Sequence, residues 1–210
     1  MKTNENGRSM IEMLGVLAII GVLSVGGIAG YSKAMTKYRV NKTIDTISMI
    51  MASTRTLFGT QKNYSALGSL SSGAMTADTQ KLIARTKLFP DELISGDTVS
   101  TGSNPFGGNI LIYSSARASG DSKAFMIQVT GITESACMEL ATQDWGSSLG
   151  SGLIAFGVNR DVADKYLGNC AAAAAAPDTG AHVCGGSGPM SVTDATTACK
   201  DNTILYWKFY

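Results

Sequence analysis

The residue of this chain best placed to do chemistry is Glu12, an acid at the edge of a long apolar run. No side chain is charged from Met13 to Ser32, and about 20 residues at a helical rise of about 1.5 Å would cross the roughly 30 Å hydrocarbon core of a bilayer. A carboxylate at that border is costly in lipid, so we expect it to be protonated or to bind a cation. The nearest cation is at Arg8, either its guanidinium or an amine freed by cleavage before it.

Four cysteines and a single histidine form the other group of residues that could carry chemistry. His182 lies two positions before Cys184, and Cys170 precedes both, but this spacing contains no C-x-x-C pair and we expect no metal site. A nucleophilic cysteine paired with His182 is not indicated either, because no third residue is placed to orient the pair. Cys137 and Cys199 complete the set, and four cysteines allow three disulfide connectivities between which the sequence alone does not choose.

The motifs of metal-dependent proteases and nucleotide-binding enzymes are absent from the sequence. It contains no H-E-x-x-H and no phosphate-binding Walker loop. The net charge is +1 and 16% of the residues are charged, so the chain offers no basic field to nucleic acid. We therefore expect no enzymatic activity, no cofactor and no nucleic-acid partner.

A single long helix would position Glu12. After Lys33, apolar residues recur at steps of mostly three and four, which is the pattern of an amphipathic helix that buries one stripe. We predict one helix from about Ser9 to Phe58, apolar on all sides in its first half and on one face in its second. The stripe comprises Met35, Tyr38, Ile44, Ile47, Met51, Thr54 and Phe58, and the opposite, charged face comprises Lys37, Arg39, Lys42, Asp45 and Arg55.

The rest of the chain predicts a head of mixed helices and strands. Residues 60–103 are polar and small with one helical patch near 79–88, and we expect this connector to lie on the surface. The last strand should insert into the sheet, with Trp207 in the core. The fold class is α+β, with the long helix packed against an antiparallel sheet. The predicted strands are 109–113, 124–130, 149–158 and 203–210, with a tight turn at 104–108 and a capped helix at 133–142.

The N-terminal pattern resembles the prepilin N-terminus of type IV pilins and of the pseudopilins of type II secretion. It combines a short polar leader, Gly7, an acid at the fifth position after that glycine and an uninterrupted apolar run. In this family a dedicated peptidase cuts after the glycine and methylates the new N-terminus, and the glutamate pairs with the terminal amine of a neighbouring subunit. The resemblance implies cleavage between Gly7 and Arg8 and an assembly role for Glu12. The chain departs from the family at Arg8, where an apolar residue is usual.

Two further stretches resemble the type IVb pilins, the enteric class that includes the toxin-coregulated and bundle-forming pilus subunits. One is the turn Asn104-Pro105-Phe106-Gly107-Gly108 before a strand. The other is a pair of Ala-Cys motifs, with Cys137 on the inner face of a predicted helix and Cys199 followed by a lysine. Type IVb pilins join two such cysteines. The resemblance therefore implies a disulfide between Cys137 and Cys199, which leaves Cys170 with Cys184.

The resemblance also implies an organisation and a function. The segments are a leader (1–7), a transmembrane and assembly half of the helix (8–32), an amphipathic half (33–59) and an α+β head (60–210). The precursor would span the inner membrane once with its head in the periplasm. Prepilin peptidase and an inner-membrane machinery would then convert it into a homo-oligomeric helical filament on the cell surface, for adhesion, aggregation or motility.

Other interpretations of the sequence remain. The chain could be a minor pilin, a type II secretion pseudopilin or a monomeric membrane-anchored binding domain. A secretory signal peptide or an uncut signal anchor would explain the apolar run. Neither of these explains why Glu12 follows Gly7 at this interval.

Overall fold

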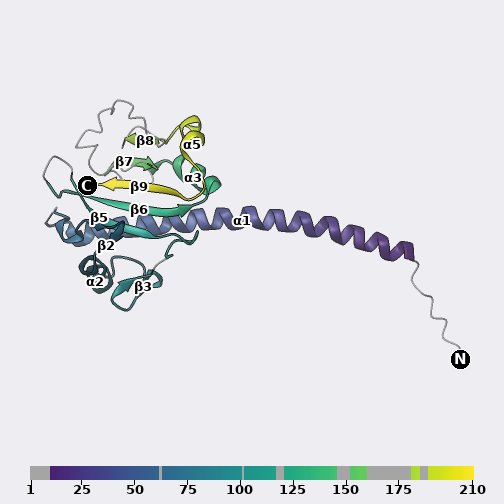
Figure 1. The fold of residues 1–210 in the computed structure, drawn as a ribbon, viewed down its shortest axis with the longest axis horizontal. Helices are drawn as coiled ribbons and strands as arrows, with labels where there is room; N and C mark the ends of the chain where they lie inside the picture. Colours follow the sequence, from purple (N-terminus) through teal and green to yellow (C-terminus); the bar gives the residue numbers. More distant parts are fainter. Residues whose placement is uncertain are drawn as a thin grey trace. The chain divides into compact units, whose positions relative to one another are not determined.

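The computed structural model describes residues 10–61, 63–100, 102–116, 121–145, 152–159, 181–184 and 189–210 of the 210-residue chain. The chain divides into two compact units, Met1–Tyr38 and Arg39–Tyr210. The first unit contributes only helix to the described residues. The second unit contains a five-stranded sheet, several short helices and two small hairpins (Figure 1).

One helix, α1 (Met10–Phe58), runs for 49 residues, which confirms the predicted long helix. Every side chain from residue 10 to residue 34 is exposed, whereas residues at helical spacing are buried from Val40 to Phe58. Three of the buried residues are threonines whose hydroxyls donate to the carbonyl four positions earlier, Thr43 at 2.9 Å, Thr46 at 2.8 Å and Thr54 at 2.6 Å. These bonds satisfy hydroxyls that would otherwise be costly to bury.

The sheet of the second unit is antiparallel and has the order β5-β6-β9-β7-β8. Its last strand in the sequence is its middle strand, so the predicted insertion of the C-terminus is confirmed. The register places Ile127 and Phe156 on either side of Trp207. The strands are β5 (Ile110–Ser115), β6 (Ala124–Ile132), β9 (Thr203–Phe209), β7 (Leu153–Val158) and β8 (Ala181–Cys184).

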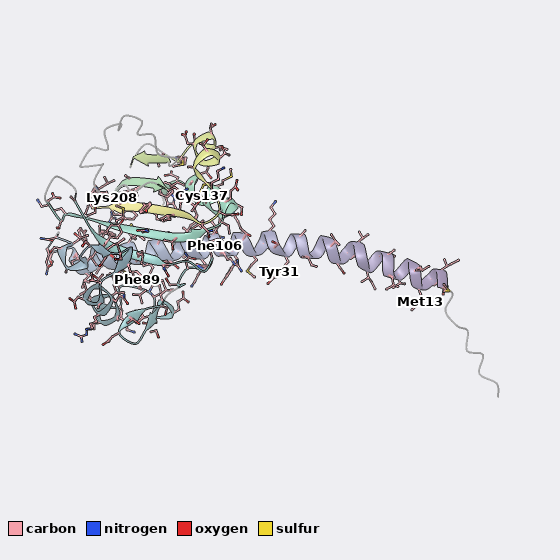
Figure 2. All side chains as sticks on the ribbon, in the orientation of Figure 1. Met13, Tyr31, Phe89, Phe106, Cys137 and Lys208 are labelled. Atoms are coloured by element: carbon pink, nitrogen blue, oxygen red, sulfur yellow. A yellow bond between two sulfur atoms is a disulfide. The ribbon has the colours of Figure 1, made fainter. Side chains whose placement is uncertain are left out.

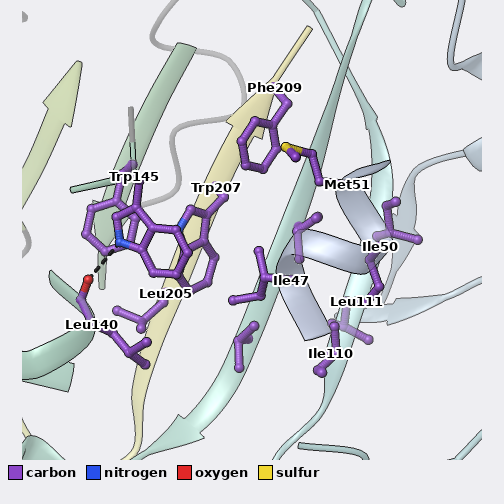
Figure 3. Close-up of a cluster of buried hydrophobic side chains, with 14 of the residues drawn as sticks. Ile47, Ile50, Met51, Ile110, Leu111, Leu140, Trp145, Leu205, Trp207 and Phe209 are labelled. Carbon is purple, nitrogen blue, oxygen red and sulfur yellow. Dashed lines mark hydrogen bonds between the residues drawn. The ribbon is translucent and has the colours of Figure 1, made fainter. Parts of the chain in front are cut away.

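The main core lies between the buried stripe of α1 and one face of this sheet (Figure 3). Trp207 lies at its centre, with ring centroids 4.9 Å from Trp145 and 5.2 Å from Phe156. Burying each large apolar side chain stabilises the fold by roughly 1.5–3 kcal/mol. The residues that face one another across the core include Ile47, Ile50 and Met51 of α1 and Leu205, Trp207 and Phe209 of β9.

The connector at residues 60–103 was expected to lie on the surface, but several of its residues are buried in the core. It forms two hairpins, β1 (Leu70–Ser71) with β2 (Ala74–Met75) and β3 (Ile94–Ser95) with β4 (Thr98–Val99), and a helix, α2 (Ala77–Thr86). Its apolar residues follow no single period, because they lie in several short elements and in the turns between them. Those that join the main core are Tyr64, Leu67, Met75, Ile83, Leu88, Phe89 and Leu93.

The connector also covers β5, an edge strand of the sheet. The backbone N–H of Ser114 donates to the carbonyl of Gly68 at 2.8 Å, and that of Ile112 faces the Met75 sulfur at 3.4 Å. An uncovered edge would present unpaired N–H and C=O groups to other chains. The first half of the connector therefore packs into the core and protects the sheet.

The predicted turn at 104–108 is present, and its contacts explain why asparagine and glycine stand at two of its positions. Asn104 is buried, and its side chain donates to the carbonyl of Thr130 at 2.6 Å. Its Oδ1 accepts from the N–H groups of Phe106 and Gly108 at 2.8 and 3.0 Å. A Cβ at Gly108 would collide with the Thr130 carbonyl, so only glycine fits there. One buried amide thus holds the turn against β6.

Candidate functional site

The candidate site for assembly is the N-terminal half of α1. An 18-residue window of this half has a mean hydropathy of 2.2, carries at most two charged residues and has no buried residue. Met10, Leu17 and Leu23 are 81%, 62% and 68% exposed, and side chains extend on all sides of the helix from Met13 to Tyr31 (Figure 2). So much contiguous apolar surface requires lipid or other apolar helices around it.

Glu12 lies in the first turn of α1 and is exposed. Gly15, Gly26 and Gly30 follow it by three, fourteen and eighteen positions, close to whole numbers of helical turns, so all lie on one side. A methyl group added at any of these glycines would meet nothing within 4 Å. Another helix can therefore approach closely on the side that carries the acid. The predicted cleavage site at Gly7 and Arg8 lies outside the described residues.

One polar side chain in the middle of this half is satisfied within the helix. The Ser24 hydroxyl donates to the carbonyl of Ile20 at 2.7 Å. Hydroxyls bonded in this way are tolerated in lipid, where water cannot replace the partner. Within residues 10–32, Glu12 is the only charged side chain. The chemistry of the apolar half is therefore concentrated at its start.

A disulfide joins Cys137 of α3 (Glu134–Ala141) to Cys199, which follows α5 (Val192–Ala198). This is the pairing that the resemblance implied, and both cysteines are fully buried. The bridge spans 62 positions, and a loop of that length would stabilise the fold by about 4 kcal/mol in the chain-entropy model. Cys170 and the side chain of Cys184 lie outside the described residues, so their pairing stays a prediction.

Helix α3 is capped by a distant residue. Thr133 stands at the N-cap position, but its side chain makes no capping hydrogen bond. The carboxylate of Asp201 instead accepts from the backbone N–H of Glu134 at 3.1 Å. At the other end, the Trp145 indole donates to the carbonyl of Leu140 at 2.7 Å (Figure 3). The last segment of the chain therefore holds α3 at its start as well as through the disulfide.

Arg55 was placed on the charged face of the helix opposite the apolar stripe, but in the structure it is only partly exposed. Its guanidinium lies 5.7 Å from the ring centroid of Phe209, and a Cβ at Gly152 would collide with it. Burial raises the pKa of the Tyr64 hydroxyl above its ordinary value, and the charge of Arg55 opposes this rise. Arg55 therefore packs over the end of the central strand instead of facing only water. Lys42, on the same predicted face, forms an exposed ion pair with Glu92 at 2.6 Å.

A model of a known protein family matches most of this chain. The model described as PilS N terminal matches residues 37–207. The chain belongs to the PilS family. This pilin is 29% identical over 209 residues to the toxin coregulated pilin of Vibrio cholerae, a match covering 95% of this chain and 86% of the relative. It is 28% identical over 214 residues to the major structural subunit of the bundle-forming pilus of Escherichia coli, covering 98% and 95%.

The fold has a relative among solved structures. The crystal structure of TcpA, a type IV pilin from the El Tor biotype of Vibrio cholerae, superimposes with a TM-score of 0.51 at 18% identity. The match covers 82% of this chain and 99% of TcpA. The predicted pilin fold and the type IVb resemblance are therefore confirmed. The protein is a structural pilus subunit, and the pseudopilin and anchored-domain alternatives are not favoured.

Proposed function

We propose that this pilin is the main subunit of a surface filament used for adhesion, aggregation or motility. The observation that carries the proposal is the exposed apolar half of α1, which no other part of the described chain covers. Moving this half from lipid into a bundle of like helices keeps its apolar surface away from water at every stage. The relatives named as pilus subunits support the same role.

The proposed precursor is a single-pass inner-membrane protein with its head in the periplasm. Prepilin peptidase would cut it between Gly7 and Arg8, and an inner-membrane machinery would insert it into the filament. The proposed segments are the leader (1–7), the assembly half of the helix (8–32), its amphipathic half (33–59) and the head (60–210). The disulfide fits this route, because such bridges persist in oxidising compartments outside the cytoplasm.

Glu12 would set the axial register of the filament. After cleavage, the amine of Arg8 and the carboxylate of Glu12 carry opposite charges within one apolar bundle. Leaving either charge buried without its partner would cost several kcal/mol, so a subunit is held where its amine meets a neighbour's carboxylate. Gly15, Gly26 and Gly30, on the same side of the helix as Glu12, allow the close approach of another helix that this pairing needs. In this chain the Arg8 guanidinium would add a second cation close to the same carboxylate.

Substitution of Glu12 tests this role. We expect Glu12→Ala and the nearly isosteric Glu12→Gln to leave a stable membrane-bound subunit and to reduce sheared filaments at least about tenfold, which corresponds to about 1.4 kcal/mol of lost pairing. Immunoblots of membranes and of sheared fractions provide the measurement. Ser24→Ala is the matched control, because it removes a polar group from the same helix without removing a charge. Normal piliation in both Glu12 variants would overturn the register role.

A further inference from the structure

The last strand of the chain completes the sheet. β9 pairs with β6 on one side and with β7 on the other, and within the described sheet β6 and β7 have no pairing with each other (Figure 1). Without β9, the sheet would separate into two pairs of strands, β5 with β6 and β7 with β8. The residues that join the two halves of the sheet are therefore those of β9.

β9 also fills the centre of the core. Leu205, Trp207 and Phe209 face α1, and Lys208 faces the opposite side of the sheet. All four side chains are fully buried. An extended segment with alternating large apolar residues is the pattern that a two-sided strand site recognises, because backbone bonds give affinity and side-chain pockets give specificity.

The start of β9 is held by contacts made before the strand enters the sheet. Cys199 is tied to α3 four positions ahead of Thr203, and Asp201 accepts from the N-terminus of the same helix. Asn159, at the end of β7, donates its side-chain amide to the carbonyl of Ala198 at 2.8 Å. Its Oδ1 accepts from the N–H of Ile204 at 3.0 Å. These contacts place the start of the strand between β6 and β7.

The far end of β9 is held by different parts of the head. The N–H of Tyr210 donates to the carbonyl of Gly152, just before β7, at 3.0 Å. Arg55 of α1 lies over the ring of Phe209. These contacts involve the last residue of β9 and the residue after it, so they can form only when the whole strand is in place.

We propose that the space between β6 and β7 is a binding site for one extended strand, which β9 (Thr203–Phe209) fills after the two strand pairs on either side have formed. A subunit truncated before β9 stays open and is excluded from assembly. The exclusion from assembly rests on the proposed function, whereas the strand site itself does not.

The test uses the full chain in detergent with a specific protease site inserted between Lys200 and Asp201, both exposed. Cleavage leaves Cys199 bonded to Cys137 and frees the segment 201–210 from the backbone. We expect the cut protein to keep its near-UV circular dichroism and its protease resistance. After unfolding, removal of the released peptide and transfer back to native buffer, both signals should be lost. Addition of a synthetic peptide with the sequence of residues 201–210 should restore them in a saturable way.

Two controls separate the strand site from general effects of cleavage. A peptide carrying Trp207→Ala should bind at least about 100-fold more weakly, because it lacks the central core side chain. A chain cut in the exposed β3–β4 turn, between Gly96 and Asp97, should keep its signals after the same unfolding and refolding with both fragments present. Native signals that persist after peptide removal, or that the native peptide fails to restore, would overturn the proposal. The readout involves no filaments, so a failure of the assembly proposal would not affect it.

Discussion

The two halves of α1 share one secondary structure and differ in what covers their side chains. From residue 10 to residue 34 every side chain is exposed, whereas from Val40 to Phe58 a regular stripe is buried under the sheet. The second half is stabilised by the chain itself. The first half has to be stabilised by lipid or by other subunits. In this pilin, the head covers one side of the second half of α1, whereas nothing in the described chain covers the first half.

The largest expected difference comes from the same kind of truncation in the two regions. Trp207→Ala, in the core against the second half of α1, should lower the free energy of unfolding of the head by about 3–5 kcal/mol. Leu17→Ala, in the exposed half, should change it by less than about 0.5 kcal/mol. Urea unfolding in detergent, followed by near-UV circular dichroism, measures both. Equal destabilisation by the two variants would break the distinction between the halves.

The disulfide is expected to have the next largest effect, confined to the head. Replacing Cys137 and Cys199 together by alanine should cost about 2–5 kcal/mol, because the bridge closes a long loop and both cysteines are buried. The membrane anchoring of the subunit should not change. Intact mass with thiol labelling of the native protein adds a check on the second predicted bridge. Labelling of two thiols would contradict the pairing of Cys170 with Cys184.

A smaller effect distinguishes the distant cap from the local one. Asp201→Ala removes the acceptor for the α3 N-terminus and should cost about 0.5–2 kcal/mol, the usual value of an N-cap. Thr133→Ala should cost less than about 0.5 kcal/mol, because that side chain makes no capping bond. Thermal unfolding of the two variants beside the parent provides the measurement. The reverse order would mean that α3 is capped by its own sequence.

These predictions show what the sequence could and could not provide. The long helix, β6 and β9 were predictable, because each depends on a local run or period of apolar residues. The order of the strands was not, because it depends on pairings between segments far apart in the chain. The role of the connector was missed for a related reason. Tyr64, Leu67 and Phe89 enter the core singly, without a repeated spacing.

The site was predictable to a similar degree. Glu12 stands out because a single charge borders a long apolar run, and Cys137 with Cys199 followed from the family resemblance. Asp201 as a helix cap and Arg55 as a cover for Phe209 were not foreseen. When a charged residue lies on a predicted polar face, the sequence does not indicate whether it binds a residue on a distant element. Only the fold brings these pairs together.

The smallest effect appears only at high pH and belongs to the head, at a connector residue, Tyr64, that packs against Phe58 of the covered half of α1. Burial raises the pKa of Tyr64 in the folded head above its unfolded value, so the stability that it contributes is present below about pH 10 and is lost as pH rises through the folded pKa. Tyr64→Phe should therefore flatten the decline of stability above about pH 10 and leave the profile at neutral pH unchanged. Unfolding midpoints across this range measure it. A parallel decline in the variant would contradict the assignment.

The central claim is that other copies of the chain bury the exposed half of α1 in the filament, and that Glu12 sets the register of each subunit. Electron cryomicroscopy of sheared filaments tests it most directly. We predict that residues 10–34 lie inside the filament, and that the Glu12 carboxylate lies within hydrogen-bonding distance of the amine of Arg8 in a neighbouring subunit. A filament in which Glu12 faces solvent, or in which the chain still begins at Met1, would contradict the account.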